Sequence, residues 1–202
     1  MSVPTFFPIL RPRPGLKLQG RGVYLRPPRL EDYRAWSELR RTSRNFLERW
    51  EPTWLDDDLG RRAFRSRLGA YARELETGEA WPFFVFRKSD DALIGAVRLF
   101  HVRRGVSQSG TIGYWVGQSH ARKGHMSDAV ATVIRFAFEG IGLHRLEAAC
   151  MPENAASRGV LEKCGFKYEG VAQSYLQIAG RWRNHVLYAS LRTDRRGRTD
   201  VG

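Results

Sequence analysis

Cysteine is scarce in this sequence, and no metal-ligand pattern accompanies it. The 202 residues include two cysteines, Cys150 and Cys164, which form no CxxC pair, and five histidines without paired spacing. Structural zinc sites need closely spaced Cys and His ligands, and disulfide frameworks need more cysteines than this. We therefore expect no structural metal and a reducing, cytoplasmic location.

Long apolar runs are also missing. No segment approaches the roughly 18 apolar residues of a membrane-spanning helix. The N-terminal stretch MSVPTFFPIL is broken by Pro4 and Pro8 and has no basic region before it, unlike a signal peptide. We expect no membrane association. With 42% hydrophobic residues, a chain of this length can bury one substantial core, which favours a single domain.

Negative charge is in short supply, since 34 Lys and Arg face 21 Asp and Glu and leave a formal net charge of +13. Basic surfaces attract phosphates without regard to sequence. The arginines are spread along the chain, however, and no helix-turn-helix, zinc-finger or RNP-like pattern is present. We expect no specific nucleic-acid binding, whereas a polyanionic cofactor or a substrate on a ribonucleoprotein would suit this charge.

In the first half of the chain, the residue pattern predicts an extended arm, then a strand, then helices, and then a meander of three strands. Residues 1–21 are rich in Pro and Gly, which favours an extended arm, and the domain is expected over 22–192 with a basic tail at 193–202. Apolar spacing predicts one or two helices within 30–50 and another over 59–75, ended by Gly78. Strands are expected at 22–28, 81–88, 92–102 and 109–117.

The second half alternates helices and strands. Apolar residues from Gly124 to Glu139 follow helical spacing, and Gly140 and Gly142 are expected to end that helix. A strand is expected over 143–151, a helix over 153–164, and a closing hairpin over 166–191 that turns near Ala179. Together these elements predict an α/β (α+β) layered fold with a central, mostly antiparallel sheet.

The loop in VGQSHARKGHMSDAV joins a strand to a helix that begins near Gly124. A helix start presents unpaired backbone N–H groups and the positive end of its dipole, so it can hold a pyrophosphate. Gly124 allows close approach, while Arg122, Lys123 and Ser127 add charge and a hydroxyl. The alternative is an ordinary basic helix start.

A second motif lies about one helix and one strand further on. In MPENAASRGVLEKCGF, Asn154 precedes Ser157 and Leu161 at spacings that place them on one helix face. This N-x-x-S-x-x-L-E-K-x-G-F pattern, after a basic Gly loop, resembles the GNAT acetyltransferase family. With the GYW strand and the hairpin SYLQIAGRWRNHVLYASL, it is most similar to the ribosomal-protein-alanine N-acetyltransferase branch.

The resemblance implies a GNAT fold whose sheet splays between its fourth and fifth strands, near Val116 and Leu143, to hold acetyl-CoA. Asn154 would contact the cofactor arm, and Ser157 would lie near the thioester sulfur. The pantetheine would bind the backbone of Tyr114, Trp115 and Val116. The pyrophosphate would bind the loop made of Ala121, Arg122, Lys123, Gly124, His125, Met126 and Ser127. The acceptor would border the final hairpin, with Tyr175, Trp182 and His185 as its candidate contacts.

Three positions depart from the family pattern. Ala121 stands where Arg or Gln is usual, Met126 replaces a small residue, and Leu161 stands where many members carry a tyrosine acid. Without that phenol, the Ser157 hydroxyl becomes the candidate that stabilises or protonates the departing thiolate. The alternative makes Ser157 a first-turn residue paired with an Asn154 N-cap.

Glu147, within the apolar strand, is the best candidate for the base that deprotonates the amine, and Tyr114 and His185 are weaker ones. The alternative for Glu147 is a strand residue paired with an arginine. Cys150 is expected to pack in the core, on the face opposite Glu147, and to form no acyl-enzyme.

The sequence therefore predicts direct transfer of acetyl from acetyl-CoA to the N-terminal α-amine of a protein, most simply a ribosomal protein, in a ternary complex. Two alternatives stay open, a GNAT enzyme of small-molecule amines and an inactive CoA-binding or RNA-associated protein. A monomer or a homodimer is expected.

Overall fold

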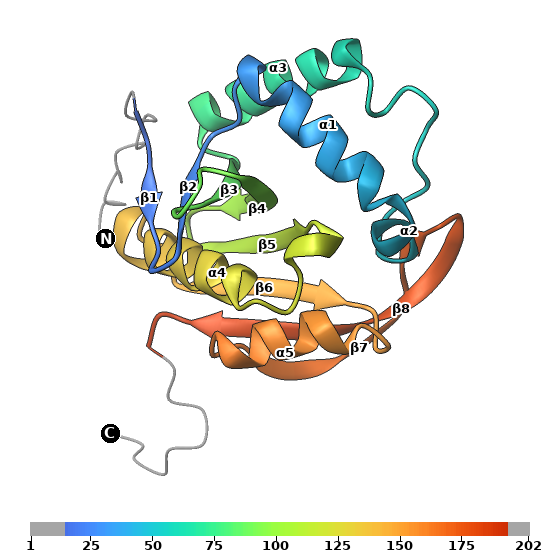
Figure 1. Cartoon of the computed structure of the whole chain (residues 1–202). Coiled ribbons are helices and arrows are strands. Elements are labelled where there is room, and N and C mark those ends of the chain that lie inside the picture. The colour runs from blue at the N-terminus through green and yellow to red at the C-terminus, as the bar shows by residue number, and fades with distance from the viewer. Residues whose placement is uncertain (1–14, 194–202) are drawn as a thin grey trace, which may run out of the picture.

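The computed structural model describes residues 15–193 and shows an eight-stranded sheet with helices on both faces (Figure 1). The strands are β1 (Leu18–Gln19), β2 (Val23–Arg26), β3 (Trp81–Arg87), β4 (Leu93–Arg103), β5 (Ser109–Val116), β6 (Arg145–Cys150), β7 (Lys167–Ile178) and β8 (Arg181–Leu191). The α-helices are α1 (Tyr33–Thr42), α2 (Arg44–Leu47), α3 (Arg61–Thr77), α4 (His125–Arg135) and α5 (Ala155–Lys163). Short 3-10 turns lie at Leu30–Asp32 (η1), Glu48–Trp50 (η2) and Gln118–His120 (η3).

The strand order is β1-β2-β3-β4-β5-β6-β8-β7, and every neighbouring pair is antiparallel except β5 and β6. The expected mostly antiparallel sheet is therefore confirmed. β5 and β6 pair only from Ser109–Arg145 to Thr111–Glu147, although both strands continue beyond that point. The expected splay thus begins after Thr111, and it leaves one edge of each strand without a partner strand.

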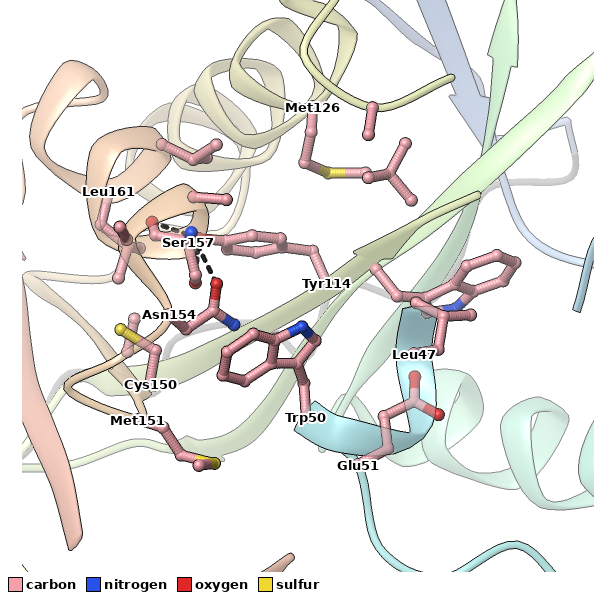
Figure 2. A pocket seen from close by; sticks show the side chains of 18 of the residues that line it. Leu47, Trp50, Glu51, Tyr114, Met126, Cys150, Met151, Asn154, Ser157 and Leu161 are labelled. Carbon is pink, nitrogen blue, oxygen red and sulfur yellow. Dashed lines mark hydrogen bonds between the residues drawn. The ribbon is translucent and has the colours of Figure 1, made fainter. Parts of the chain in front are cut away.

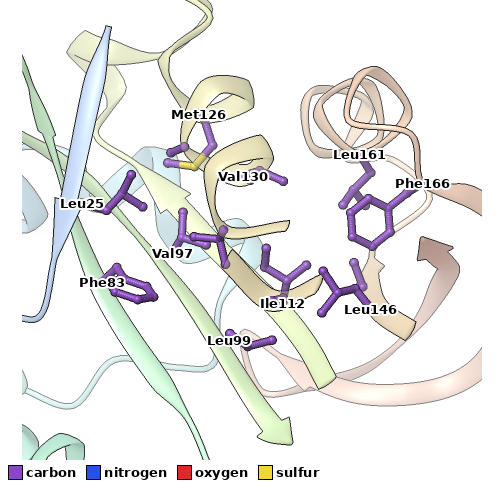
Figure 3. Packing of buried hydrophobic residues seen from close by; sticks show 14 of the residues in the cluster. Leu25, Phe83, Val97, Leu99, Ile112, Met126, Val130, Leu146, Leu161 and Phe166 are labelled. Carbon is purple, nitrogen blue, oxygen red and sulfur yellow. The ribbon is translucent and has the colours of Figure 1, made fainter. Parts of the chain in front are cut away.

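Two apolar clusters divide the faces of the sheet, and β3 shows why. Its Phe83 and Val85 join the cluster under α4, whereas Phe84 and Phe86 join the one under α1 and α3. Side chains alternate between faces along a strand, so this strand must be apolar at every position to cover both layers. Figure 3 shows Met126 and Val130 of α4 packing toward the sheet, with Leu161 and Phe166 meeting Leu146 on the same side.

The sheet begins before the expected start at Gly22. Leu18 and Gln19 form β1 against β2, within the stretch expected to be an extended arm. The turn between the two strands is held by the Asp128 carboxylate of α4, which accepts from the backbone N–H groups of Arg21 (2.9 Å) and Gly22 (2.7 Å). A carboxylate with several N–H donors makes strong, charge-assisted bonds, so this contact ties the first strands to α4.

Other boundaries follow local chemistry. Ser43 separates α1 from α2, and its buried hydroxyl accepts from the Gln118 N–H at 2.9 Å. α4 continues as a π-helical turn, Phe136–Gly140 (η4), and Gly142 then takes a φ of +72°. Residues 1–14 of the expected arm and 194–202 of the expected tail lie outside the described residues. Within the described part, no helix is long and apolar enough to cross a membrane.

Candidate active site

A cavity of about 1020 Å³ lies where β5 and β6 diverge. Its walls come from the α2–η2 segment, β5, the loop before α4, the end of β6, the start of α5 and part of β7. Sites for small molecules occupy about 300–1,000 Å³, so this cavity suits a large ligand. Figure 2 shows side chains from these elements facing one another across it.

The wall formed by β5 offers free backbone groups. Tyr114, Trp115 and Val116 pair with β4 on one edge of the strand, but no strand pairs with their other edge. All three residues line the cavity. Unpaired N–H and C=O groups at a strand edge readily bind an extended, amide-bearing ligand, because such a ligand pairs with them as a strand would.

The loop from Ala121 to Ser127 forms the wall at the start of α4. Arg122 and Gly124 both have left-handed backbones, with φ of +59° and +79°, and no side chain caps the helix. The first intrahelical bond runs from the Asp128 N–H to the Gly124 carbonyl, so the N–H groups of the first turn have no helical acceptor. Loops of this kind form concavities that attract anions.

All seven loop residues named from the sequence line the cavity: Ala121, Arg122, Lys123, Gly124, His125, Met126 and Ser127. Met126 is buried and packs into the core, close to Gly95. Its side chain therefore fills the core, and only its backbone can contact a ligand in the loop. Arg122 and Lys123 are exposed cations beside the free N–H groups. His120 lies next to them. Its pKa is lowered mainly by burial and further by the positive charges of Arg87 and Lys123.

The start of α5 carries the second motif. Asn154 is the N-cap, and its Oδ1 accepts from the Ser157 N–H at 3.0 Å. The expected Asn154 N-cap is therefore present, and it uses the Ser157 N–H and not the Ser157 hydroxyl. Both residues also line the cavity, as expected for contacts to a cofactor arm, and Figure 2 shows the Asn154 amide directed toward Trp50.

The Ser157 hydroxyl meets the phenol of Tyr114. Their oxygens are 2.9 Å apart, and the Tyr114 hydroxyl is also 3.0 Å from the Ser157 carbonyl oxygen. Burial raises the pKa of Tyr114, so its phenol stays protonated near neutral pH. This pairing was not expected from the sequence, because a strand and a helix that are 43 residues apart supply the two groups.

Glu147 does not reach the cavity. It occupies the last rung of β6 that pairs with β5, and the cavity wall on β6 begins at the next residue, Ala148. Its carboxylate accepts from Arg145 at 2.9 Å and from Arg103 at 3.1 Å. The structure therefore does not support Glu147 as the base and favours the alternative, a strand residue paired with arginine.

Of the three residues expected to contact the acceptor, one lines the cavity and two do not. His185 is buried and lines the cavity, whereas Tyr175 and Trp182 do not line it and are 47% and 65% exposed. The Tyr175 ring touches the His185 ring, with centroids 5.7 Å apart. His185 Nδ1 lies 3.0 Å from the Arg183 carbonyl. Since a carbonyl only accepts, Nδ1 carries the hydrogen in this contact, and in the neutral imidazole the lone pair then lies on Nε2.

Sequence reasoning missed the wall from Phe46 to Pro52. Trp50 faces Asn154 across the cavity in Figure 2, and Glu51 lines it below α2. Glu51 is held by Arg40 through contacts of 2.7 and 2.6 Å and accepts from the Trp54 indole at 2.8 Å. No motif marks this segment, and its first residues were expected only as part of the helical stretch within 30–50.

Cys150 is buried at the end of β6 and also lines the cavity. Burial raises the pKa of its thiol, which keeps the less nucleophilic protonated form. Among residues 15–193, no group of three or more His, Cys, Asp or Glu side chains is arranged to hold a metal ion.

Comparison with known proteins identifies this arrangement. A family model described as "Acetyltransferase (GNAT) domain" matches residues 23–167. The chain belongs to the GNAT acetyltransferase family. The match runs from β2 to the first residue of β7, so it includes β5, the loop before α4, β6 and all of α5, which supply most of the cavity wall.

Among GNAT relatives, the chain is 39% identical over 177 residues to "Probable N-acetyltransferase YjcK" of Bacillus subtilis, covering 88% of this chain and 98% of the relative. It is 35% identical over 161 residues to the "[Ribosomal protein uS5]-alanine N-acetyltransferase" of Escherichia coli, covering 80% of each. The solved structure of Mycobacterium smegmatis RimJ in complex with CoA-disulfide superimposes with a TM-score of 0.83 and 34% identity, covering 87% of both chains. The likeness to the ribosomal-protein-alanine branch is thereby confirmed.

Proposed function

We propose that this GNAT acetyltransferase transfers acetyl from acetyl-CoA to the N-terminal α-amine of a ribosomal protein. The observation that carries the proposal is the single cavity that joins a free helix start at Gly124 to the Tyr114–Ser157 pair and His185. The relatives named for ribosomal proteins support this acceptor class.

The described residues fit acetyl-CoA. The unpaired edge of β5 suits the amides of a pantetheine arm, and the loop from Arg122 to Ser127 suits a pyrophosphate. Arg122 and Lys123 would add charge-assisted contacts. Acetyl-CoA would supply the acetyl group as a thioester, and CoA would be the leaving group, as a thiolate that takes up a proton.

Ser157 would hold the proton that the leaving sulfur needs. The single phenol hydrogen of Tyr114 has two acceptors within reach, the Ser157 carbonyl oxygen at 3.0 Å and Ser157 Oγ at 2.9 Å. When it is donated to Oγ, the serine hydrogen is free to point into the cavity. The protonated phenol then backs the serine as it donates. This arrangement would take the place of the tyrosine acid that many family members carry at the position of Leu161.

His185 would receive the proton of the amine. Its Nε2 bears the lone pair, because Nδ1 donates to the Arg183 carbonyl. An N-terminal α-amine has a pKa of about 8, so it needs only a modest base near neutral pH. Glu147, which is outside the cavity, does not serve this role.

The direct test is incubation with acetyl-CoA and peptides that carry both a free α-amine and a lysine, with products located by mass spectrometry. We expect acetyl on the α-amine, with a preference for a small first residue such as alanine or serine. Acetyl found only on lysine side chains or on small-molecule amines would contradict the proposed acceptor. CoA binding without turnover on any amine would support the inactive alternative.

A further inference from the structure

A second hollow, of about 640 Å³, lies beside the large cavity. The two share Arg49, Trp50, Met151, Glu153 and Ile178. η2 and the β7–β8 turn form its walls, and Figure 2 shows Trp50 and Met151 on the far side of Tyr114 from Met126. We call this hollow the hairpin groove. It leads away from the proposed phosphate loop.

The hairpin groove is positively charged. Three of its lining residues are arginines, Arg49 from η2 and Arg181 and Arg183 from β8, whereas Glu153 is its one acidic lining residue. Arg183 donates to Glu153 at 3.2 Å. Within residues 15–193, no ion pair involves Arg49 or Arg181, and the Arg49 guanidinium lies over the Trp50 ring, 5.9 Å from its centroid. Both guanidinium groups can therefore pair with a carboxylate of a ligand.

The arginines of β8 share a strand face with His185. Positions 181, 183 and 185 alternate with Trp182 and Asn184, and side chains two apart on a strand point the same way. Exposure falls along this row, from exposed Arg181 to buried His185. The row therefore leads from the groove into the cavity, over about 13 Å at roughly 3.3 Å per residue.

We propose that the hairpin groove binds the segment that follows the acceptor's α-amine and selects acidic side chains there. The inference rests on the proposed function, since it takes the α-amine to lie near His185. An extended acceptor that advances at strand spacing would pass Arg183 and Arg181 within about its first five residues. Guanidinium groups pair with carboxylates in planar, two-bonded contacts, so Asp or Glu at these positions gains what Gln or Asn does not.

The test compares two peptides that differ only in charge, both beginning with alanine and carrying Glu or Gln at positions 3 and 5. We expect kcat/KM to favour the Glu peptide by about fivefold at low salt, the sum of two exposed charge pairs. In the Arg49→Gln/Arg181→Gln variant the preference should fall to about twofold, because Arg183, the first arginine that the acceptor passes, is kept. The matched control, Arg34→Gln/Arg62→Gln, removes the same charge from exposed helix positions outside the groove and should keep the preference.

Each other outcome contradicts the inference. Equal acetylation of both peptides by the unmodified protein would overturn the groove's role and leave the proposed function intact. If the groove variant and the control variant lost the preference equally, the overall charge of the protein would be its cause. A raised KM for acetyl-CoA with an unchanged peptide preference would assign the arginines to the cofactor, and inhibition by a short RNA that only the groove variant relieves would assign them to RNA. No acetylation of either peptide would overturn the proposed function and this inference together.

Discussion

Ser157 makes two structural contacts, one through its backbone and one through its hydroxyl, and the hydroxyl also has a proposed chemical role. The Ser157 N–H completes the Asn154 cap, and its Oγ contacts Tyr114 at 2.9 Å. Replacing the side chain with alanine leaves the capping N–H in place, so the helix start should survive. The hydroxyl can therefore be tested apart from the fold.

For Ser157→Ala we expect kcat to fall about 10²-fold, because general acids contribute at least this much, while acetyl-CoA affinity changes little. Steady-state kinetics and calorimetry measure the two quantities. Tyr114→Phe removes the phenol that contacts Ser157 but keeps the Ser157 hydroxyl, so it should lower kcat less than Ser157→Ala does. A loss confined to affinity would assign Ser157 to cofactor binding.

His185 gives a second prediction at this scale. His185→Gln should lower peptide kcat/KM at pH 7 by about 10²-fold, since the amine, with a pKa of about 8, is then mostly protonated and needs a base. At pH 9 the amine is mostly neutral, so the deficit should narrow. Glu147→Gln, outside the cavity, is the control and should follow the unmodified pH profile. A His185→Gln deficit that is equal at both pH values would indicate a structural role.

At the scale of elements, the loop between β5 and α4 is the proposed site of cofactor binding. Two left-handed residues, Arg122 and Gly124, turn the chain so that the first turn of α4 faces the cavity. A Cβ at Gly124 would meet nothing within 4 Å, so its backbone conformation and not crowding is what a substitution disturbs.

Gly124→Val should weaken acetyl-CoA binding tenfold or more, because a β-branched residue in the left-handed region costs about 1–3 kcal/mol and shifts the loop. Calorimetry measures the dissociation constant, and circular dichroism checks the fold. Gly142→Val is the matched control, since Gly142 also has positive φ and open space around a Cβ but lies outside the cavity. Unchanged affinity in Gly124→Val would refute the placement of the pyrophosphate.

On the scale of the whole molecule, the net charge of +13 affects encounter with acidic partners. Association with intact ribosomal particles should weaken at least tenfold between about 0.05 and 0.2 M salt. Binding releases counterions, which is less favourable at higher salt, and the Debye length becomes shorter. Sedimentation with ribosomes measures the association, and turnover of a short neutral peptide, which should change less, is the control. Salt-insensitive association would remove the link between charge and substrate.

Much of the fold was predictable because its signals are local. Apolar spacing gave α3 and α4, glycines marked their ends at Gly78 and Gly142, and Ala179–Gly180 placed the last turn. The cofactor residues named from the two motifs all line the cavity, since each motif spans a strand or loop and the helix that follows it. β1 was missed, because a two-residue strand has no periodicity to detect.

The sequence by itself determined the order of elements, the family and the residues at the start of α4 and α5. Only the tertiary structure decided that Glu147 stays outside the cavity, that Tyr114 meets Ser157, and that the segment from Phe46 to Pro52 forms a wall. Alternation along a strand tells which face a residue takes, but the level at which β5 and β6 part depends on the packing of the whole sheet. That level, between Glu147 and Ala148, separates an arginine-paired carboxylate from the residues that surround the site.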